Sequence, residues 1–318
     1  MMKNESIVLA ERIASHFLQE KVKAAHQIVG KGFVNQVCVV ETEEHNVIVR
    51  MNDKDQYPIF LKERWCLEQA AAVGVPGPET LSVGIMEETA YMIQTVVQGD
   101  NGLDATIDTI EIWRKLGEYA KRIHSIPVAG FGERMDPVSS TFYSPPHAGS
   151  DGSWQGYIQY NINSLTEHDP LIELGVLTQA ESKRVRQWFE RLKMETFRFG
   201  LCHGDLSLKN TMVDLTGQIT LLDWGNAEVT VVPYGDIIHM IRCQIHGEGP
   251  NRIELEAFME SYGLNEYELD QMRHVMVLKT FDTLRWAIDQ SPDEVDFYAG
   301  MARKVLTLVK EASRDGSM

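Results

Sequence analysis

The hydrophobic residues of this chain follow two different periodicities in two successive parts of the sequence. Up to residue 97, runs rich in β-branched residues alternate with polar turns, which predicts strands joined by hairpins. These runs are residues 27–41, 46–51, 81–85 and 90–97. From residue 109 onward, apolar residues recur at helical spacing over most of the sequence. The two patterns favour an α+β fold with a small strand-rich N-terminal part, a larger helical part, and a hinge near residues 95–102.

Five further segments refine this expectation. Helical stripes at 6–19 and 59–73 place helices within the strand-rich part, and Gly74 followed by prolines ends the second one. Residues 126–156 show no periodicity over a long stretch, which is typical of functional or mobile segments. Two short strand-like runs, 199–203 and 218–224, enclose a polar loop.

Charge and cysteine usage exclude several classes of protein. The 30 basic residues against 46 acidic ones give a net charge of −16, which argues against nucleic acid or an anionic membrane as a partner. The four cysteines are widely spaced, so neither a disulfide framework nor a zinc knuckle is expected. No apolar run approaches the ~20 residues that cross a bilayer, and the N-terminus does not resemble a signal peptide. We therefore expect a cytoplasmic protein with reduced thiols, monomeric or homodimeric.

The polar loop carries the clearest chemical pattern. Asp205 follows His203 and Gly204 and precedes Asn210 by five residues, while Asp223 ends the next apolar run. In a kinase catalytic loop, an Asp at this spacing orients the attacking hydroxyl, and an Asn and a second Asp bind Mg²⁺. Carboxylate and amide oxygens are the hard ligands that Mg²⁺ prefers. The alternative interpretation is an ordinary tight turn followed by an ordinary strand-end cap.

The strand-rich part contains residues that suit phosphate binding. Gly30 and Gly32 lie between two strand-like runs, where glycine lets a backbone turn approach phosphate oxygens closely. Arg50 ends the next run, and its guanidinium can hold two oxygens at once. Glu63, in the following predicted helix, can pair with Arg50. Each signal is weak alone, since many hairpins contain Gly-x-Gly and many strands end in a solvated Arg.

Taken together, residues 28–236 resemble the aminoglycoside phosphotransferase and choline kinase group of small-molecule kinases, in which the catalytic loop reads His-Gly-Asp followed by Asn. The resemblance implies a protein-kinase-like bilobal fold. Residues 1–98 would form the nucleotide-binding lobe, with a small antiparallel sheet. Residues 99–318 would form the mostly helical lobe, with the catalytic loop and the acceptor site.

The resemblance also assigns roles to individual residues. Asp205 would be the catalytic base, and Asn210 with Asp223 would bind Mg²⁺. The remaining residues would bind ATP or GTP: Gly30 and Gly32 as the phosphate loop, Arg50 paired with Glu63, and the backbone of Thr95 and Val97 at the adenine edge. Asp236, at the start of a predicted helix, would support the catalytic loop.

Departures from protein kinases indicate the kind of acceptor. Asp223 is followed by Trp224 and Gly225 rather than Phe-Gly, and the interval to Tyr234 is too short for a long activation loop. A small-molecule acceptor is therefore expected, and the acidic charge suits a cationic one such as an aminoglycoside-type antibiotic. Two alternatives remain open. One is a metabolic kinase acting on choline, a ketosamine, homoserine or a methylthio-sugar, and the other is a nucleotide-binding protein without transferase activity.

Overall fold

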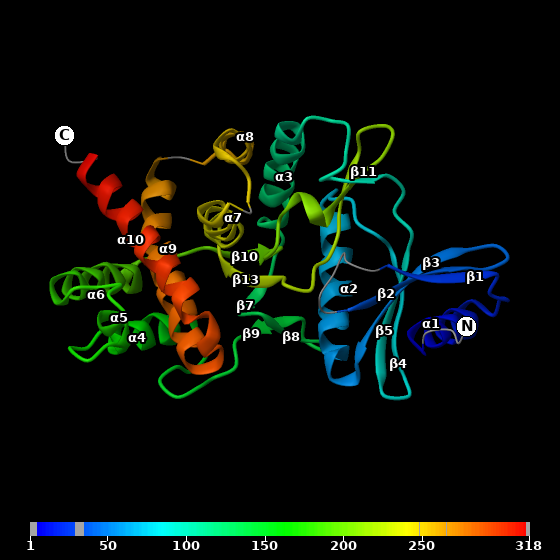
Figure 1. Cartoon of the computed structure of the whole chain (residues 1–318), viewed down its shortest axis with the longest axis horizontal. Coiled ribbons are helices and arrows are strands. Elements are labelled where there is room, and N and C mark those ends of the chain that lie inside the picture. Colours follow the sequence, from blue (N-terminus) through cyan, green and yellow to red (C-terminus); the bar gives the residue numbers. More distant parts are fainter. Residues whose placement is uncertain (1–4, 29–34, 248, 265, 316–318) are drawn as a thin grey trace. The chain divides into compact units, whose positions relative to one another are not determined.

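The computed structural model describes residues 5–28, 35–247, 249–264 and 266–315 (Figure 1). The strands are β1 (Ala24–Ile28), β2 (Gln36–Glu41), β3 (Asn46–Asp53), β4 (Thr80–Met86), β5 (Thr89–Thr95), β6 (Asp100–Asn101), β7 (Ala129–Phe131), β8 (Arg134–Asp136), β9 (Thr141–Tyr143), β10 (Phe199–Cys202), β11 (Thr211–Val213), β12 (Ile219–Leu221) and β13 (Glu228–Val231). The helices are α1 (Glu5–Leu18), α2 (Tyr57–Ala72), α3 (Thr109–Ile123), α4 (Trp154–Ser164), α5 (Pro170–Glu173), α6 (Gln179–Met194), α7 (Tyr234–His246), α8 (Arg252–Tyr262), α9 (Glu266–Gln290) and α10 (Val295–Asp315).

The chain divides into two compact units. Unit 1 comprises residues 1–112, 134–141 and 208–227, and unit 2 comprises residues 113–133, 142–207 and 228–318. The division falls inside the loop with the predicted catalytic residues, because Asp205 belongs to unit 2 whereas Asn210 and Asp223 belong to unit 1. The lobe boundary predicted after residue 98 remains a prediction.

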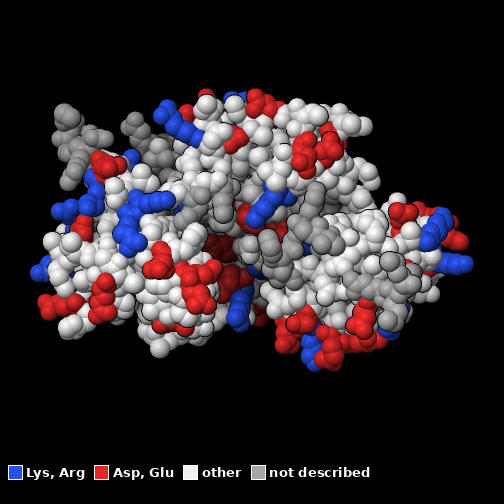
Figure 2. All heavy atoms as spheres, viewed as in Figure 1, with Lys and Arg blue, Asp and Glu red and all other residues white. Residues whose placement is uncertain are grey.

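Charged side chains are spread over the face of the molecule that Figure 2 shows, where acidic and basic groups are interspersed and form no single acidic patch. The net charge of −16 acts on a charged ligand at long range.

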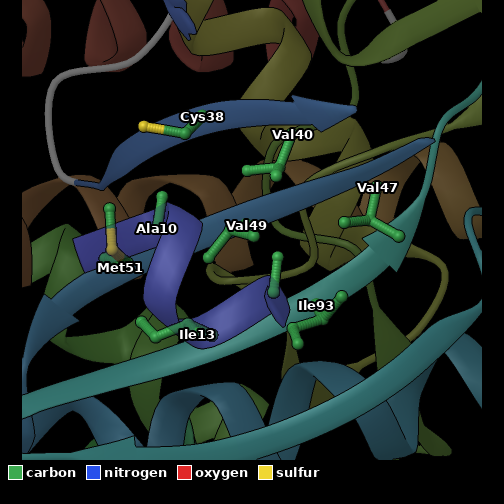
Figure 3. Packing of buried hydrophobic residues seen from close by; sticks show 9 residues of the cluster. Ala10, Ile13, Cys38, Val40, Val47, Val49, Met51 and Ile93 are labelled. Atoms are coloured by element: carbon green, nitrogen blue, oxygen red, sulfur yellow. The ribbon is translucent and has the colours of Figure 1, made fainter. Parts of the chain in front are cut away.

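Unit 1 is built on an antiparallel five-stranded sheet in the order β1-β2-β3-β5-β4. Side chains alternate between the two faces of a strand, and on β3 the residues Val47, Val49 and Met51 all point to the face that α1 covers. There they pack with Ala10 and Ile13 of α1, which lie three residues apart on one helical face (Figure 3). Because these residues of β3 face α1, the residues that alternate with them must face the opposite side of the sheet.

The opposite face of the sheet is covered by α2, which packs against β4 and β5. Phe60 of α2 contacts Ala90 and Met92 of β5 in a second buried cluster. Arg50 of β3 is paired in register with Met92, so its side chain lies on this α2 face. The alternation of apolar residues around Arg50 thus directs it toward α2.

A smaller sheet completes unit 1, in the order β12-β11-β6. Strands β11 and β12 form an antiparallel hairpin in which Thr211 pairs with Leu221. Its turn is closed by Asp214, whose carboxylate accepts hydrogen bonds from the backbone of Thr216 and Gln218. The sequence pattern did not predict β6 or β11, because each has only two or three residues.

Unit 2 is mostly helical. Helix α9 packs against α4, α6, α7 and α10, and the antiparallel pair β10-β13 lies against α7 through β13. Helix α8 begins with a capping box, in which Asn251 and Glu254 each accept from the other's backbone N–H. Its C-terminal Gly263 has a φ of 81°, the left-handed conformation that commonly ends helices.

The structure confirms the predicted α+β class and the long predicted elements. The helices expected at 6–19, 59–73 and 109–124 are α1, α2 and α3, with ends shifted by one or two residues. The expected run of C-terminal helices appears as α7 to α10. The aperiodic stretch 126–156 contains the short strands β7, β8 and β9 between turns, which are too brief to show a periodicity in sequence.

Candidate functional site

The β11–β12 hairpin brings the two predicted metal ligands side by side within unit 1. Asn210 immediately precedes β11, and Asp223 follows β12 by one residue, so an antiparallel pair places both at the same end of the hairpin. The backbone N–H of Leu222 donates to the carbonyl of Asn210 at 2.8 Å. Asn210 is buried, whereas 53% of the Asp223 side chain is exposed. One amide and one accessible carboxylate thus converge at one edge.

Asp223 adopts an unusual backbone conformation. Its φ of 55° lies in the left-handed region, which Asp enters more readily than most non-glycine residues. This turn directs the chain away from β12, and the backbone N–H of Trp224 lies 3.3 Å from Oε1 of Glu63 on α2. The conformation is therefore held by a contact from a helix that is distant in sequence.

Arg50 lies between two carboxylates of unit 1. Its Nη1 donates to Oε1 of Glu63, and its Nη2 lies 3.3 Å from Oδ1 of Asp223. Burial would lower the pKa of Arg50, but Glu63 and Asp223 together raise it. The predicted Arg50–Glu63 pair is present in the structure. The link from Arg50 to Asp223 was not predicted, since 173 residues separate them.

Lys62 is a residue of this network that sequence reasoning missed. Its buried ammonium donates to the carbonyls of Gly225 at 3.0 Å and Ala227 at 2.7 Å. Adjacent residues of α2, Lys62 and Glu63, therefore both hold the segment after Asp223. A lone Lys in an amphipathic helix usually lies in solvent, so no local pattern indicated this contact.

The remaining predicted nucleotide-binding residues are partly visible. Gly30 and Gly32 lie outside the described residues. Thr95 ends β5, and its N–H donates to the carbonyl of Glu79 at 3.0 Å. Val97 follows in the irregular segment after β5. The N–H of Thr95 is thus occupied, which leaves the prediction for its carbonyl and for the Val97 N–H untested.

In unit 2, the segment with Asp205 is fixed through its backbone. The buried carboxylate of Asp236, in the first turn of α7, accepts from the N–H of His203 at 3.1 Å and of Gly204 at 2.7 Å. His124, the residue after α3, contributes with its Nε2 3.0 Å from Asp236 Oδ2. Burial would raise the pKa of Asp236, but the contacts with His124 and with the loop outweigh it and lower the pKa. Asp236 thus holds the loop from the start of a helix, as expected.

The side chain of Asp205 lies beside a second residue of α7. Nε2 of His239 is 3.5 Å from Oδ1 of Asp205 and 3.5 Å from Sγ of Cys243. Burial would lower the pKa of His239, but Asp205 and Cys243 together raise it from 6.5 to about 9. The sequence held no signal for this contact, because no motif connects residues 205 and 239.

A separate polar cluster connects α4 with α9. Asn161 donates to Asp282 at 3.0 Å and accepts from Arg285 at 3.1 Å, while Arg285 also pairs with the buried Asp169 at 2.7 Å. Tyr157 also donates to Asp282, and burial raises the pKa of this carboxyl group. Asp282 therefore belongs to an internal network of unit 2.

Comparison with known proteins settles the family. A sequence model of the phosphotransferase enzyme family matches residues 26–275, most of the chain. The chain belongs to this family. It is a small-molecule phosphotransferase with an alcohol group as acceptor, which confirms the expectation of an enzyme.

Solved structures confirm the fold. An aminoglycoside phosphotransferase, APH(4)-Ia in complex with ADP and hygromycin B, has a TM-score of 0.63 at 18% identity, covering 93% of this chain and 97% of that one. The kanamycin and GDP complex of APH(2")-IIia has a TM-score of 0.62 at 15% identity, covering 93% and 97%. A proposed fructosamine-3-kinase from Haemophilus somnus 129PT has a TM-score of 0.60 at 11% identity, covering 96% and 98%. These likenesses confirm the protein-kinase-like architecture.

Among curated proteins, no match to this chain was found. In the described part of the chain, no helix is both long and apolar enough to cross a membrane.

Proposed function

We propose that this phosphotransferase transfers the γ-phosphate of ATP or GTP to a hydroxyl of an aminoglycoside-type molecule, with Asp205 as catalytic base. One observation carries the assignment of the base. Asp205 follows a backbone turn that Asp236 fixes through two hydrogen bonds, and a histidine contacts its carboxylate. A catalytic carboxylate must hold its position without reorganising during the reaction, and this arrangement meets that requirement.

The donor side of the reaction belongs to unit 1. The residues at the hairpin edge fit Mg²⁺, because Asp223 offers an accessible carboxylate and Asn210 an amide oxygen. Bound there, Mg²⁺ would neutralise charge on the nucleotide phosphates. Arg50 would hold phosphate oxygens together with the Gly30–Gly32 turn, and Glu63 would keep Arg50 oriented. Thr95 and Val97 would receive the purine.

The class of acceptor is proposed from the charge of this protein and from its similarity to solved structures. Three carboxylates near the start of α10 are exposed, those of Asp289, Glu294 and Asp296. The net charge of −16 attracts cations at long range. Similar structures hold hygromycin B and kanamycin. Together these features support a polycationic sugar as acceptor.

A sugar-amine kinase is the second candidate. The proposed fructosamine-3-kinase from Haemophilus somnus 129PT covers 96% of this chain, as much as an aminoglycoside phosphotransferase does. Because both classes share the donor chemistry, the acceptor alone distinguishes them. A fructosamine is also a cationic sugar derivative, so the charge argument applies equally to it.

One experiment tests the function and the acceptor class together. Release of ADP and GDP would be measured for the wild type and Asp205→Ala with aminoglycosides, fructosamines, choline and macrolides. We expect acceptor-dependent release from the wild type with an aminoglycoside and none from Asp205→Ala, whose nucleotide affinity stays unchanged. Asp104→Ala is the matched control, since Asp104 is an exposed turn residue, and it should retain full turnover.

The possible failures are separable. Turnover by Asp205→Ala at the wild-type rate would contradict the role of Asp205. Release that depends on fructosamine alone would replace the antibiotic assignment with the metabolic one. Asp223→Ala should weaken Mg²⁺–nucleotide binding itself, and an unchanged Mg²⁺ requirement in that variant would contradict the proposed metal site.

A further inference from the structure

His239 contacts the proposed catalytic carboxylate, and neither the family pattern nor the sequence assigns it a function. Its Nε2 lies 3.5 Å from Oδ1 of Asp205, within unit 2. We propose that His239 is a positioning residue for phosphoryl transfer, whose imidazolium holds the Asp205 carboxylate in the orientation that receives the acceptor hydroxyl. The proposal rests on the proposed function, because it needs Asp205 as the base.

Helix α7, which carries His239, is also bound to the backbone of the loop with Asp205. Asp236 and His239 are three residues apart on α7, so they lie on the same helical face. Asp236 binds the backbone N–H groups of His203 and Gly204, and it is itself bound by His124. One helix face thus fixes first the backbone of the loop and then, one turn later, the carboxylate of Asp205.

His239 is half-buried and lies beside a carboxylate. Its side chain is 37% exposed. Burial disfavours its protonation, but Asp205 and Cys243 favour it more, so its pKa rises from 6.5 to about 9. At neutral pH His239 is therefore an imidazolium. A charged N–H donor binds a carboxylate more strongly than a neutral one, and it restrains the direction of both oxygens.

Other charged groups around α7 interact elsewhere. Glu228 of β13 pairs with Lys279 of α9 at 2.7 Å. On α10, Lys304 donates to the carbonyl of Ile245 at 3.3 Å. Arg242, on α7 itself, lies with its Nε 3.2 Å from Sδ of Met301. The groups that raise the pKa of His239 are therefore Asp205 and Cys243, against the opposing effect of burial.

The consequence for catalysis follows from geometry. A base acts only when one of its oxygens points at the proton to be transferred, and rotation of the carboxylate removes that alignment. Because His239 holds Oδ1, it also sets where Oδ2 points. Loss of His239 should reduce kcat and leave nucleotide binding unchanged, since the predicted nucleotide-binding residues all belong to unit 1.

The test compares His239→Gln and His239→Ala with the wild type across pH 6 to 10.5, using the acceptor that supports turnover. We expect kcat at pH 7.5 to fall about tenfold in His239→Ala and less in His239→Gln, which keeps a neutral N–H donor, with KM for the nucleotide unchanged. Wild-type kcat should decline as His239 loses its proton near pH 9. That decline should be absent from both variants. His168→Gln, at an exposed loop position, is the matched control and should match the wild type.

Several results would overturn the proposal. One is a His239→Gln variant with wild-type kcat and a wild-type alkaline decline. Another is a raised KM for the nucleotide at unchanged kcat, and a third is a lowered melting temperature with normal turnover, which would make His239 merely structural. If His239→Ala fails to fold, the pH profile of kcat in His239→Gln still tests the proposal. Failure of the proposed function is recognised separately, by turnover in Asp205→Ala.

Discussion

The two units hold their functional carboxylates in different ways. In unit 1, Asp223 is half exposed and contacts the charged Arg50, which in turn pairs with the buried Glu63. In unit 2, Asp236 is fully buried and binds mainly backbone N–H groups of the Asp205 loop. The first arrangement relies on side-chain charges that compensate one another, and the second on a carboxylate that accepts from the main chain.

This difference has a physical consequence for each region. A buried ion pair is only as favourable as its geometry, because desolvation of both charges opposes it. Backbone N–H donors cannot rotate away, so a carboxylate that accepts from them fixes a loop more firmly. We therefore expect the loop with Asp205 to be the more rigid of the two, and the segment after Asp223 to respond more readily to a ligand.

The largest effect is expected at the backbone anchor. Asp236→Asn replaces one of the two acceptor oxygens by an amide nitrogen, which cannot accept, so one of the bonds from His203 and Gly204 is lost. The free energy of unfolding should fall by about 3 kcal/mol, and turnover should drop with it, as urea denaturation and initial rates would show. Asp136 also accepts from two backbone N–H groups, those of Val138 and Ser139, but through one oxygen at an exposed site. The amide oxygen of Asp136→Asn can take its place, so the stability should barely change. Equal losses in the two variants would contradict the importance of the two buried acceptor oxygens of Asp236.

The ion pair of unit 1 should give a smaller loss. Glu63→Gln leaves the buried Arg50 without its main counter-charge, so the free energy of unfolding should fall by about 2 kcal/mol and KM for the nucleotide should rise. Glu87→Gln breaks the exposed pair with Arg12 in the same unit and should cost about 0.5 kcal/mol or less. Thermal unfolding and nucleotide titration measure both. A larger loss of unfolding free energy in Glu63→Gln than in Asp236→Asn would contradict the expectation that the backbone anchor of unit 2 contributes more than the ion pair of unit 1.

Lys62 tests whether α2 controls the segment after Asp223. Lys62→Met removes the hydrogen bonds to Gly225 and Ala227, so we expect a loss of about 1 kcal/mol in unfolding free energy. KM for Mg²⁺–ATP should rise a few-fold with little change in kcat. Lys54→Met, which breaks an exposed pair with Glu88, should leave both quantities at wild-type values. An unchanged KM in Lys62→Met would show that this segment holds its position without α2.

The smallest change in unfolding free energy is expected for the pair of Glu181 and Lys310, which lies outside both networks. Hydrogen bonds from Lys310 and Thr178 lower the pKa of Glu181 from 4.5 to about 2, against the opposing effect of burial. A depressed acid pKa stabilises the fold above pH 4.5, and this contribution is lost as the pH falls toward 2. Glu181→Gln should therefore flatten part of the stability profile between these values, by a few tenths of a kcal/mol after solvent screening. If the stability of Glu181→Gln changed with pH as steeply as that of the wild type, Glu181 would not be the source of this pH dependence.

Sequence patterns predicted helices and strands well where apolar residues repeat along one face. They predicted contacts between segments that are far apart in the sequence poorly. Val47, Val49 and Met51 alternate in sequence, and the structure buries all three. The Arg50–Glu63 pair was also predicted, because the two residues take the places of the strand lysine and the helix glutamate in the kinase pattern. The Lys62 and His239 contacts were not, since they join segments 163 and 34 residues apart that no local pattern relates.

The sequence by itself determined the α+β class, the family and the identity of the residues proposed for chemistry, because periodicity and the spacing within one loop are local properties of the chain. The tertiary structure alone decided what surrounds those residues. It placed Arg50 between Glu63 and Asp223, anchored the Asp205 loop on Asp236, and set His239 beside the carboxylate. These contacts depend on which helix face packs against which segment, and only the folded chain fixes that packing.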